Sequence, residues 1–172
     1  MGRAAAAKLE PMPEGAAELL AGDLCWLLSR ATHSLLTELT AGLETLGISP
    51  RAHQVLMAAR AGEHTQIELA RTIGLDKTTM VVTLDELERA GLAERRPAPS
   101  DRRARVIEIT RAGERKLREA DAILARIRED VLSVLPADER DVFLRALGRL
   151  VSERLSEPVA TAQPVRRRAP RA

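Results

Sequence analysis

Residues 65–91 decide the fold, and their sequence is TQIELARTIGLDKTTMVVTLDELERAG. The stretch begins with a capping box, because the Thr65 hydroxyl can accept a hydrogen bond from the backbone N–H of Glu68, whose carboxylate can reach back. Gly74 predicts a tight turn and Asp76 predicts an N-cap, so a second helix starts three or four residues after the first one ends. A glycine at position 91 ends the second helix. Two helices joined in this way indicate a helix-turn-helix.

The hydrophobic period changes directly after this stretch. Residues 92–96 predict a strand, residues 97–101 a turn, and residues 105–110, in which apolar and polar side chains alternate, a returning strand. Five arginines and one aspartate lie between positions 95 and 105. An arginine-rich hairpin after a helix-turn-helix is typical of a wing, and a local cluster of cations favours an anionic partner such as DNA.

Helical patterns flank this module on both sides. Apolar residues recur every three or four positions from Leu20 to Leu46 and predict one long amphipathic helix. Ser49 and Pro50 supply the N-cap and the first-turn proline of a helix that runs to about Ala61. Helical periodicity resumes at residue 111, breaks at Pro136 and continues to residue 155. The predicted fold class is mainly α with a two-stranded β wing, a winged helix-turn-helix with further helices at both ends.

The ends of the chain differ from its centre. Residues 1–14 and 156–172 are rich in Ala, Pro and Arg and have no apolar periodicity, so we expect two disordered arms. The C-terminal arm is basic, which leaves the rest of the chain close to neutral. Between the arms we expect one domain, residues 15–155, with the winged module at about 50–110 and flanking helices at about 16–46 and 111–155.

Composition excludes several classes of protein. The 172 residues are 45% hydrophobic and 30% charged, with one Trp, one Phe and no Tyr, which favours a helical soluble protein over a β-sandwich. No apolar run approaches the roughly 18 residues that span a bilayer, and the N-terminus lacks the apolar core of a signal peptide. We therefore expect no membrane association and a cytoplasmic location.

The chain has few residues for metal or covalent chemistry. Cys25 is the single cysteine, and His33, His53 and His64 are scattered along the sequence, so we expect no intrachain disulfide, no metal site and no cofactor. There is no nucleophile elbow or phosphate loop either, which argues against an enzyme. A helical adaptor dimer that does not bind DNA is the remaining alternative from another class.

A longer spacing pattern resembles the wing signature of the MarR family of winged helix-turn-helix transcriptional regulators. It consists of Asp101, Arg102 and Arg103, then six residues, Thr110, two residues and Gly113. Further agreement lies at Leu69–Ala70, Thr79–Met80, Leu87–Glu88 and Gly91–Leu92, and the resemblance covers about residues 16–155. The sequence departs from the family at Val82, where many members have a small polar residue or arginine, and at Ala93, which replaces a larger aliphatic residue. The Val82 departure means that no operator sequence can be carried over.

A recognition helix presents its first turn and one face to the major groove. The candidate DNA contacts are Lys77, Thr78, Thr79, Val82 and Thr83 on the second helix of the motif, with Thr65 and Gln66 at the start of the first. Lys77 can bind a phosphate or a guanine edge, and Val82 can contact a thymine methyl. The alternative is that Thr79, Met80 and Val82 belong partly to the core.

The wing supplies a second set of candidates. A narrow minor groove attracts an inserted guanidinium, and the position of Arg103 in the signature assigns it that role. Arg102 and Arg105 are then candidates for the flanking phosphates, and Asp101 shapes the turn or orients an arginine. An ordinary solvated hairpin is the alternative.

The flanking helices predict a homodimer. One recognition helix contacts only a few base pairs, so such proteins pair two helices across a twofold axis. The first helix and the last two carry more apolar surface than a small wing domain can bury, and in the resembling family these helices form the dimer interface. We expect a dimer on a pseudo-palindromic double-stranded operator, and repression, because a dimer that covers a promoter blocks polymerase.

The signal that controls DNA binding is predicted less directly than the binding itself. The resemblance implies a small aromatic or phenolic effector between the dimerisation helices and the DNA-binding lobe, and the residues that could line such a cleft are Trp26, Arg30, His33, His53 and Met57. Each could equally fill the core or the interface. The segment around Cys25 resembles the branch of the family that senses organic hydroperoxides, but that branch supports its cysteine with tyrosines, which this chain lacks. A small apolar role for Cys25 is therefore favoured, with redox sensing as the alternative.

Overall fold

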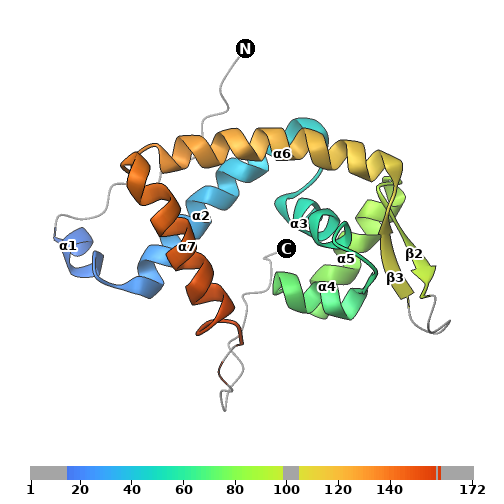
Figure 1. Ribbon diagram of the computed structural model, residues 1–172, viewed down its shortest axis with the longest axis horizontal. Coiled ribbons are helices and arrows are strands. Elements are labelled where there is room, and N and C mark those ends of the chain that lie inside the picture. Colours follow the sequence, from blue (N-terminus) through green and yellow to red (C-terminus); the bar gives the residue numbers. More distant parts are fainter. Residues whose placement is uncertain (1–14, 99–104, 158, 160–172) are drawn as a thin grey trace, which may run out of the picture. The chain divides into compact units, whose positions relative to one another are not determined.

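The computed structural model describes residues 15–98, 105–157 and 159 (Figure 1). The protein is mainly helical with one small antiparallel sheet, which confirms the predicted fold class. In chain order the elements are α1 (Ala16–Leu20), α2 (Leu24–Leu43), a 3₁₀ turn (Glu44–Leu46), α3 (Pro50–Ala59), β1 (His64–Thr65), α4 (Gln66–Ile73), α5 (Lys77–Arg89), β2 (Ala93–Pro97), β3 (Arg105–Ile109), α6 (Arg111–Leu132) and α7 (Ala137–Ser152).

The chain divides into two compact units, residues 1–128 and residues 129–172. The first unit holds α1 to α5, the sheet and most of α6. The second holds the end of α6 and all of α7. Among the described residues, no helix combines the length and the apolar character needed to cross a membrane.

The N-terminal helical pattern is interrupted once, which the sequence prediction of a single long helix missed. The break lies between α1 and α2, where Asp23 adopts an extended conformation and its carboxylate accepts a hydrogen bond from the backbone N–H of Trp26. Asp23 therefore acts as the N-cap of a new helix rather than as one residue of a continuous one.

The caps of the helix-turn-helix are those predicted from the sequence. Thr65 and Glu68 form the complete capping box of α4. The Asp76 carboxylate accepts from the backbone N–H of Thr79 at 2.9 Å at the start of α5. Gly74 and Gly91 follow the two helices with φ of 74° and 67°, values that glycine adopts without steric cost.

The sheet has three strands in the order β1-β3-β2, all antiparallel. The predicted hairpin corresponds to β2 and β3, in register from Ala93 opposite Ile109 to Pro97 opposite Arg105. The third strand, β1, was not predicted. It is two residues long, and it pairs His64 with Ile107 just before the α4 cap. This pairing attaches the start of the helix-turn-helix to the hairpin.

The core of the first unit gathers α3, α4, α5 and the sheet around fully buried aliphatic side chains. The largest are Leu43, Val55, Leu56, Leu69, Met80, Leu84, Leu87, Ile107 and Leu117. Figure 1 shows α3, α4 and α5 on one side of the hairpin of β2 and β3. Because α5 and the hairpin share this core, the helix that we expect to contact DNA rests on a packed scaffold.

Candidate nucleic-acid interface

The first turn of α5 is a polar, solvent-exposed surface. Lys77 and Thr78 are both exposed, directly after the N-cap Asp76. Thr79 is partly buried, and its hydroxyl donates to the second oxygen of the Asp76 carboxylate at 2.8 Å. The lone pairs of that hydroxyl remain, so Thr79 can accept but not donate a hydrogen bond to a ligand while this pair is intact.

The next turn of α5 separates into an outer and an inner side. Val82 is 51% exposed, which places an aliphatic side chain on the outer surface beside the polar first turn. Thr83 is only 4% exposed, and its hydroxyl donates to the Thr79 carbonyl at 2.8 Å. This burial argues against the predicted contact of Thr83 with DNA, because the 3.6-residue period places it with Met80 and Leu84 on the core side.

The two candidates on α4 are both partly buried. The Thr65 hydroxyl accepts from the Glu68 N–H and donates to the Glu68 carboxylate, so its hydrogen bonds serve the capping box. These bonds, with the one from the Thr65 backbone N–H, lower the pKa of Glu68 below its ordinary value of 4.5. Gln66, the first residue of the helix, takes no part in the hydrogen bonds of this capping box.

The arginines of the hairpin are not equivalent. Arg105 is exposed at the start of β3, whereas Arg102, Arg103 and Asp101 lie outside the described residues. Arg96 pairs with Glu94 and Glu108 of the same hairpin, and these contacts raise its pKa above the ordinary value for arginine. Arg95 faces α5 and binds two carboxylates there. Carboxylates therefore offset the charge of two of the five arginines predicted to make the hairpin basic, Arg95 and Arg96.

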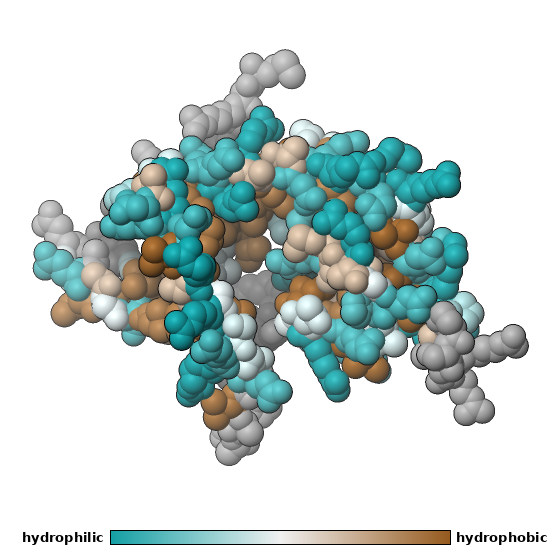
Figure 2. Space-filling view, in the orientation of Figure 1, coloured by the Kyte–Doolittle hydropathy of each residue, from teal (hydrophilic) through white to brown (hydrophobic). Residues whose placement is uncertain are grey.

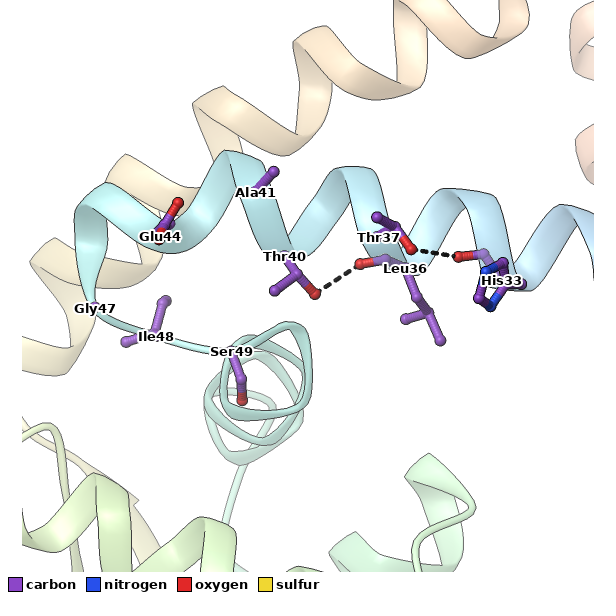
Figure 3. Close-up of a pocket in the computed structure, with 9 residues that line it drawn as sticks. All are labelled: His33, Leu36, Thr37, Thr40, Ala41, Glu44, Gly47, Ile48 and Ser49. Atoms are coloured by element: carbon purple, nitrogen blue, oxygen red, sulfur yellow. Dashed lines mark hydrogen bonds between the residues drawn. The ribbon is translucent and has the colours of Figure 1, made fainter. Parts of the chain in front are cut away.

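A separate pocket of about 740 Å³ lies along α2 and the loop that leads to α3 (Figure 3). Its lining includes His33, Leu36, Thr40 and Ile48. Figure 3 shows the side chains of His33, Leu36 and Thr40 on the side of α2 that faces this loop. The Thr37 and Thr40 hydroxyls donate to helix carbonyls four residues earlier, so they offer acceptors to the pocket.

Of the five residues predicted to line an effector cleft, the structure brings His33 to this pocket. Trp26 and Arg30 lie further back on α2, and Met57 is 47% exposed on α3; none of them lines it. His53 has a different role, because it is buried and its Nε2 lies 2.8 Å from a carboxylate oxygen of Asp121 on α6. Sequence periodicity placed His53 on α3 correctly but carried no signal for a partner 68 residues away.

Cys25 is the second residue of α2, and its side chain is exposed with a free thiol. The expected role of Cys25, a small apolar side chain in the helix interface, concerns contacts with a second copy and stays a prediction. An exposed thiol beside Trp26 is accessible to reagents, yet no tyrosine exists in the chain to assist it.

Comparison with known proteins agrees with this geometry. A family model described as the MarR family matches residues 46–104. A transcriptional repressor named CouR, bound to a 23-mer DNA duplex, is 28% identical, with a TM-score of 0.74 over 81% of this chain and 99% of that protein. CouR from Rhodococcus jostii RHA1 bound to p-coumaroyl-CoA is 29% identical, with a TM-score of 0.70 over 83% and 97% of the two chains.

A third similar structure is a MarR-family transcriptional regulator from Rhodococcus sp. RHA1, with 28% identity and a TM-score of 0.71 over 78% of this chain and 96% of that one. In each case nearly the whole length of the known protein is matched. The residues matched by the family model include the capped helix-turn-helix and the first wing strand, β2. Residues 46–104 thus match the MarR family model, and the chain shares its fold with solved MarR-family transcriptional regulators over most of its length.

Proposed function

We propose that this regulator binds a pseudo-palindromic operator in double-stranded DNA as a homodimer and represses transcription in the cytoplasm. The observation that carries the proposal is the exposed first turn of α5, with Lys77 and Thr78, held beside an arginine-bearing hairpin. A helix N-terminus in the major groove and a cationic wing in the minor groove are complementary to duplex DNA. CouR, a repressor of this fold bound to a 23-mer DNA duplex, supports double-stranded DNA as the partner.

Dimerisation is supported by apolar side chains on the helices at both ends of the chain. In the first unit Leu19, Leu24 and Leu27 are 87%, 55% and 43% exposed, and Figure 2 shows hydrophobic surface where Figure 1 places the start of α2. In the second unit the exposed apolar residues of α7 are Val142, Phe143, Leu144, Leu150 and Val151. Apolar area of this extent on one protomer favours burial against a second copy.

Control by a small molecule is the second part of the proposal. The pocket along α2 combines an aliphatic wall, Leu36 and Ile48, with His33 and two threonine oxygens as hydrogen-bonding groups. An aromatic or phenolic molecule fits such a lining, since it carries a flat apolar body and one polar end. CouR in complex with p-coumaroyl-CoA supports this class of effector. A ligand that favours a spacing of α5 helices unsuited to the groove would release the operator.

The deciding experiment is selection of bound duplexes from random DNA with the full-length protein. We expect an inverted repeat whose half-sites lie about 34 Å apart, and a dimer in sedimentation at micromolar concentration. Lys77→Ala should weaken binding, whereas Arg118→Ala, a change to an exposed cation on α6, should leave it unchanged. No enriched sequence, or a stable monomer, would refute the proposal.

The signal is then tested on the selected operator. Salicylate, p-coumarate and p-coumaroyl-CoA are titrated against the complex, in parallel with cumene hydroperoxide on the wild type and on Cys25→Ser. Release by an aromatic compound, weakened by Leu36→Glu, supports the effector pocket. Release by hydroperoxide that depends on Cys25 would instead support redox control.

A further inference from the structure

Arg95 joins the wing to the recognition helix through three hydrogen bonds to two carboxylates. Its guanidinium donates to Asp85 at 2.7 Å and to Glu88, and its backbone N–H donates to the other oxygen of Glu88 at 2.9 Å. Asp85 and Glu88 are three residues apart on α5, so they lie one above the other on a single face. One planar guanidinium on β2 therefore bridges two successive turns of α5.

The surroundings of these groups make the contact more than a surface ion pair. The side chains of Arg95 and Glu88 are 23% and 31% exposed, while that of Asp85 is 47% exposed. Partial burial reduces solvent screening, and the binding of two carboxylates by separate guanidinium nitrogens fixes direction as well as distance. Glu88 holds both the backbone and the side chain of the same residue, which leaves little freedom for β2 to rotate against the helix.

The neighbouring arginine provides an internal contrast. Arg96 points to the opposite face of the strand, since side chains alternate along it, and it pairs with Glu94 and Glu108 of the hairpin itself. Arg96 thus forms ion pairs within the hairpin, whereas Arg95 connects the hairpin to α5. A further connection between α5 and β2 is the short turn at Gly91 and Leu92, where the Leu92 N–H donates to the Leu87 carbonyl.

We infer that Arg95 is a positioning residue that sets the angle between the wing and the recognition helix, so that the two bind DNA as one rigid unit. The inference rests on the proposed function and extends it to a residue that does not itself contact DNA. Two binding elements held at the correct separation gain affinity because the second contact is effectively intramolecular. Preorganisation of this kind also lowers the entropy that is lost on binding.

The orientation can be measured without DNA. Spin labels at Glu86→Cys on α5 and Pro97→Cys on β2, in a Cys25→Ser background, report the distance between helix and wing; labelled protomers are diluted with unlabelled ones. Arg95→Met, which keeps the length of the side chain, should about double the width of the distance distribution. Arg96→Met is the matched control and should leave the width unchanged. An unchanged distribution in Arg95→Met would overturn the inference.

Operator affinity is measured on the same variants without labels. Arg95→Met should bind the selected operator roughly tenfold more weakly and with a shallower salt dependence, since the contacts of the wing are lost. Arg96→Met should stay within about threefold. Asp85→Asn removes one arm of the bridge and provides a milder variant if Arg95→Met does not fold. A broadened distribution with unchanged affinity would contradict the role in DNA binding, whereas a wild type that binds no duplex would refute the proposed function alone.

Discussion

The hydroxyl of Thr110 donates a hydrogen bond to the carbonyl of Gly91 at 2.7 Å. This bond connects Thr110, directly before α6, to Gly91 in the turn after α5. The same hydroxyl accepts from the Gly113 N–H at 3.0 Å, in the manner of an N-cap. The Thr110 backbone N–H in turn donates to the Leu92 carbonyl. One side chain therefore closes the base of the wing and starts α6.

Replacement of Thr110 by Val removes both hydrogen bonds of the hydroxyl while it keeps the shape of the side chain. We expect a loss of about 1–2 kcal/mol in the free energy of unfolding, from the lost cap and the lost donor to Gly91. Urea denaturation at fixed protein concentration measures it. Thr110→Ser keeps the hydroxyl and should stay close to wild type; equal losses in both variants would contradict the role of the hydroxyl.

Gly113 of α6 packs against the backbone of Leu92, in the turn that follows α5. A Cβ atom on this residue would stand 2.0 Å from the Leu92 carbonyl oxygen and 2.7 Å from a side-chain carbon of Ile109. Because the oxygen belongs to the backbone, the clash cannot be relieved by a rotamer change. We expect Gly113→Ala to lower stability by about 1–3 kcal/mol or more.

Gly148 on α7 is the matched control, since no atom lies within 4 Å of a Cβ built there. Gly148→Ala should be neutral or slightly stabilising, because alanine is the better helix former. The melting temperatures of the two variants, measured by thermal unfolding, test these expectations. A Gly113→Ala variant as stable as wild type would show that α6 can shift away from Leu92 at little cost.

His53 and Asp121 connect α3 to α6 inside the first unit. The imidazole is buried, and the same carboxylate lies 3.9 Å from the Arg60 guanidinium. Asp121→Ala leaves a buried ring nitrogen without its partner, so we expect a loss of about 1–3 kcal/mol in unfolding experiments. Glu114→Ala, which removes the pair of a half-buried carboxylate with the exposed Arg118 on the same helix, should cost less than about 1 kcal/mol. Similar losses for the two variants would mean that the His53 contact adds nothing.

Glu68 makes the cap of α4 depend on pH. Its hydrogen bonds to Thr65 lower its pKa in the folded state, so the charged carboxylate stabilises the fold above the ordinary value of 4.5. This stabilisation is lost as the pH falls through the lowered folded-state pKa. The melting temperature of wild type should exceed that of Glu68→Gln at neutral pH, and the gap should close below the ordinary value. A gap that is constant from roughly pH 7 to pH 3 would contradict this.

The caps and turns could be predicted because they depend on neighbours in the sequence. Thr65 with Glu68, Asp76 with Thr79, and the glycines after α4 and α5 each act within a few residues, where residue type and spacing suffice. The burial of Thr83 also follows from the helical period. The sequence prediction nevertheless placed Thr83 at the DNA, because it gave more weight to the polar side chain than to its position on the helix. The break before α2 was hidden because the leucines continue across it.

The contacts that organise the site are long-range, and the sequence offers no local signal for them. Arg95 was counted among the basic residues of the hairpin, yet its acidic partners on α5 neutralise it. The partner of His53 lies on α6, and β1 is too short to show alternation before it pairs with β3. Such pairings depend on which elements the core brings together, and this is decided by packing rather than by the residue itself.

The two exposed residues Lys77 and Val82 on α5 should affect operator binding in different ways. Lys77→Ala removes one cation from the first turn, so affinity should fall to a similar extent for all duplexes and the salt slope should decrease by about 1. Val82→Ala removes an apolar contact without a change in charge, so the salt slope should stay constant while discrimination at one base-pair position weakens.

Binding isotherms at several salt concentrations, on the selected operator and on single-base variants of it, separate the two effects. Thr83→Ser serves as the control, because the Thr83 hydroxyl is bound to the Thr79 carbonyl inside the protein and should not influence base preference. A change in base preference with Thr83→Ser, but not with Val82→Ala, would mean that α5 meets DNA through its opposite face.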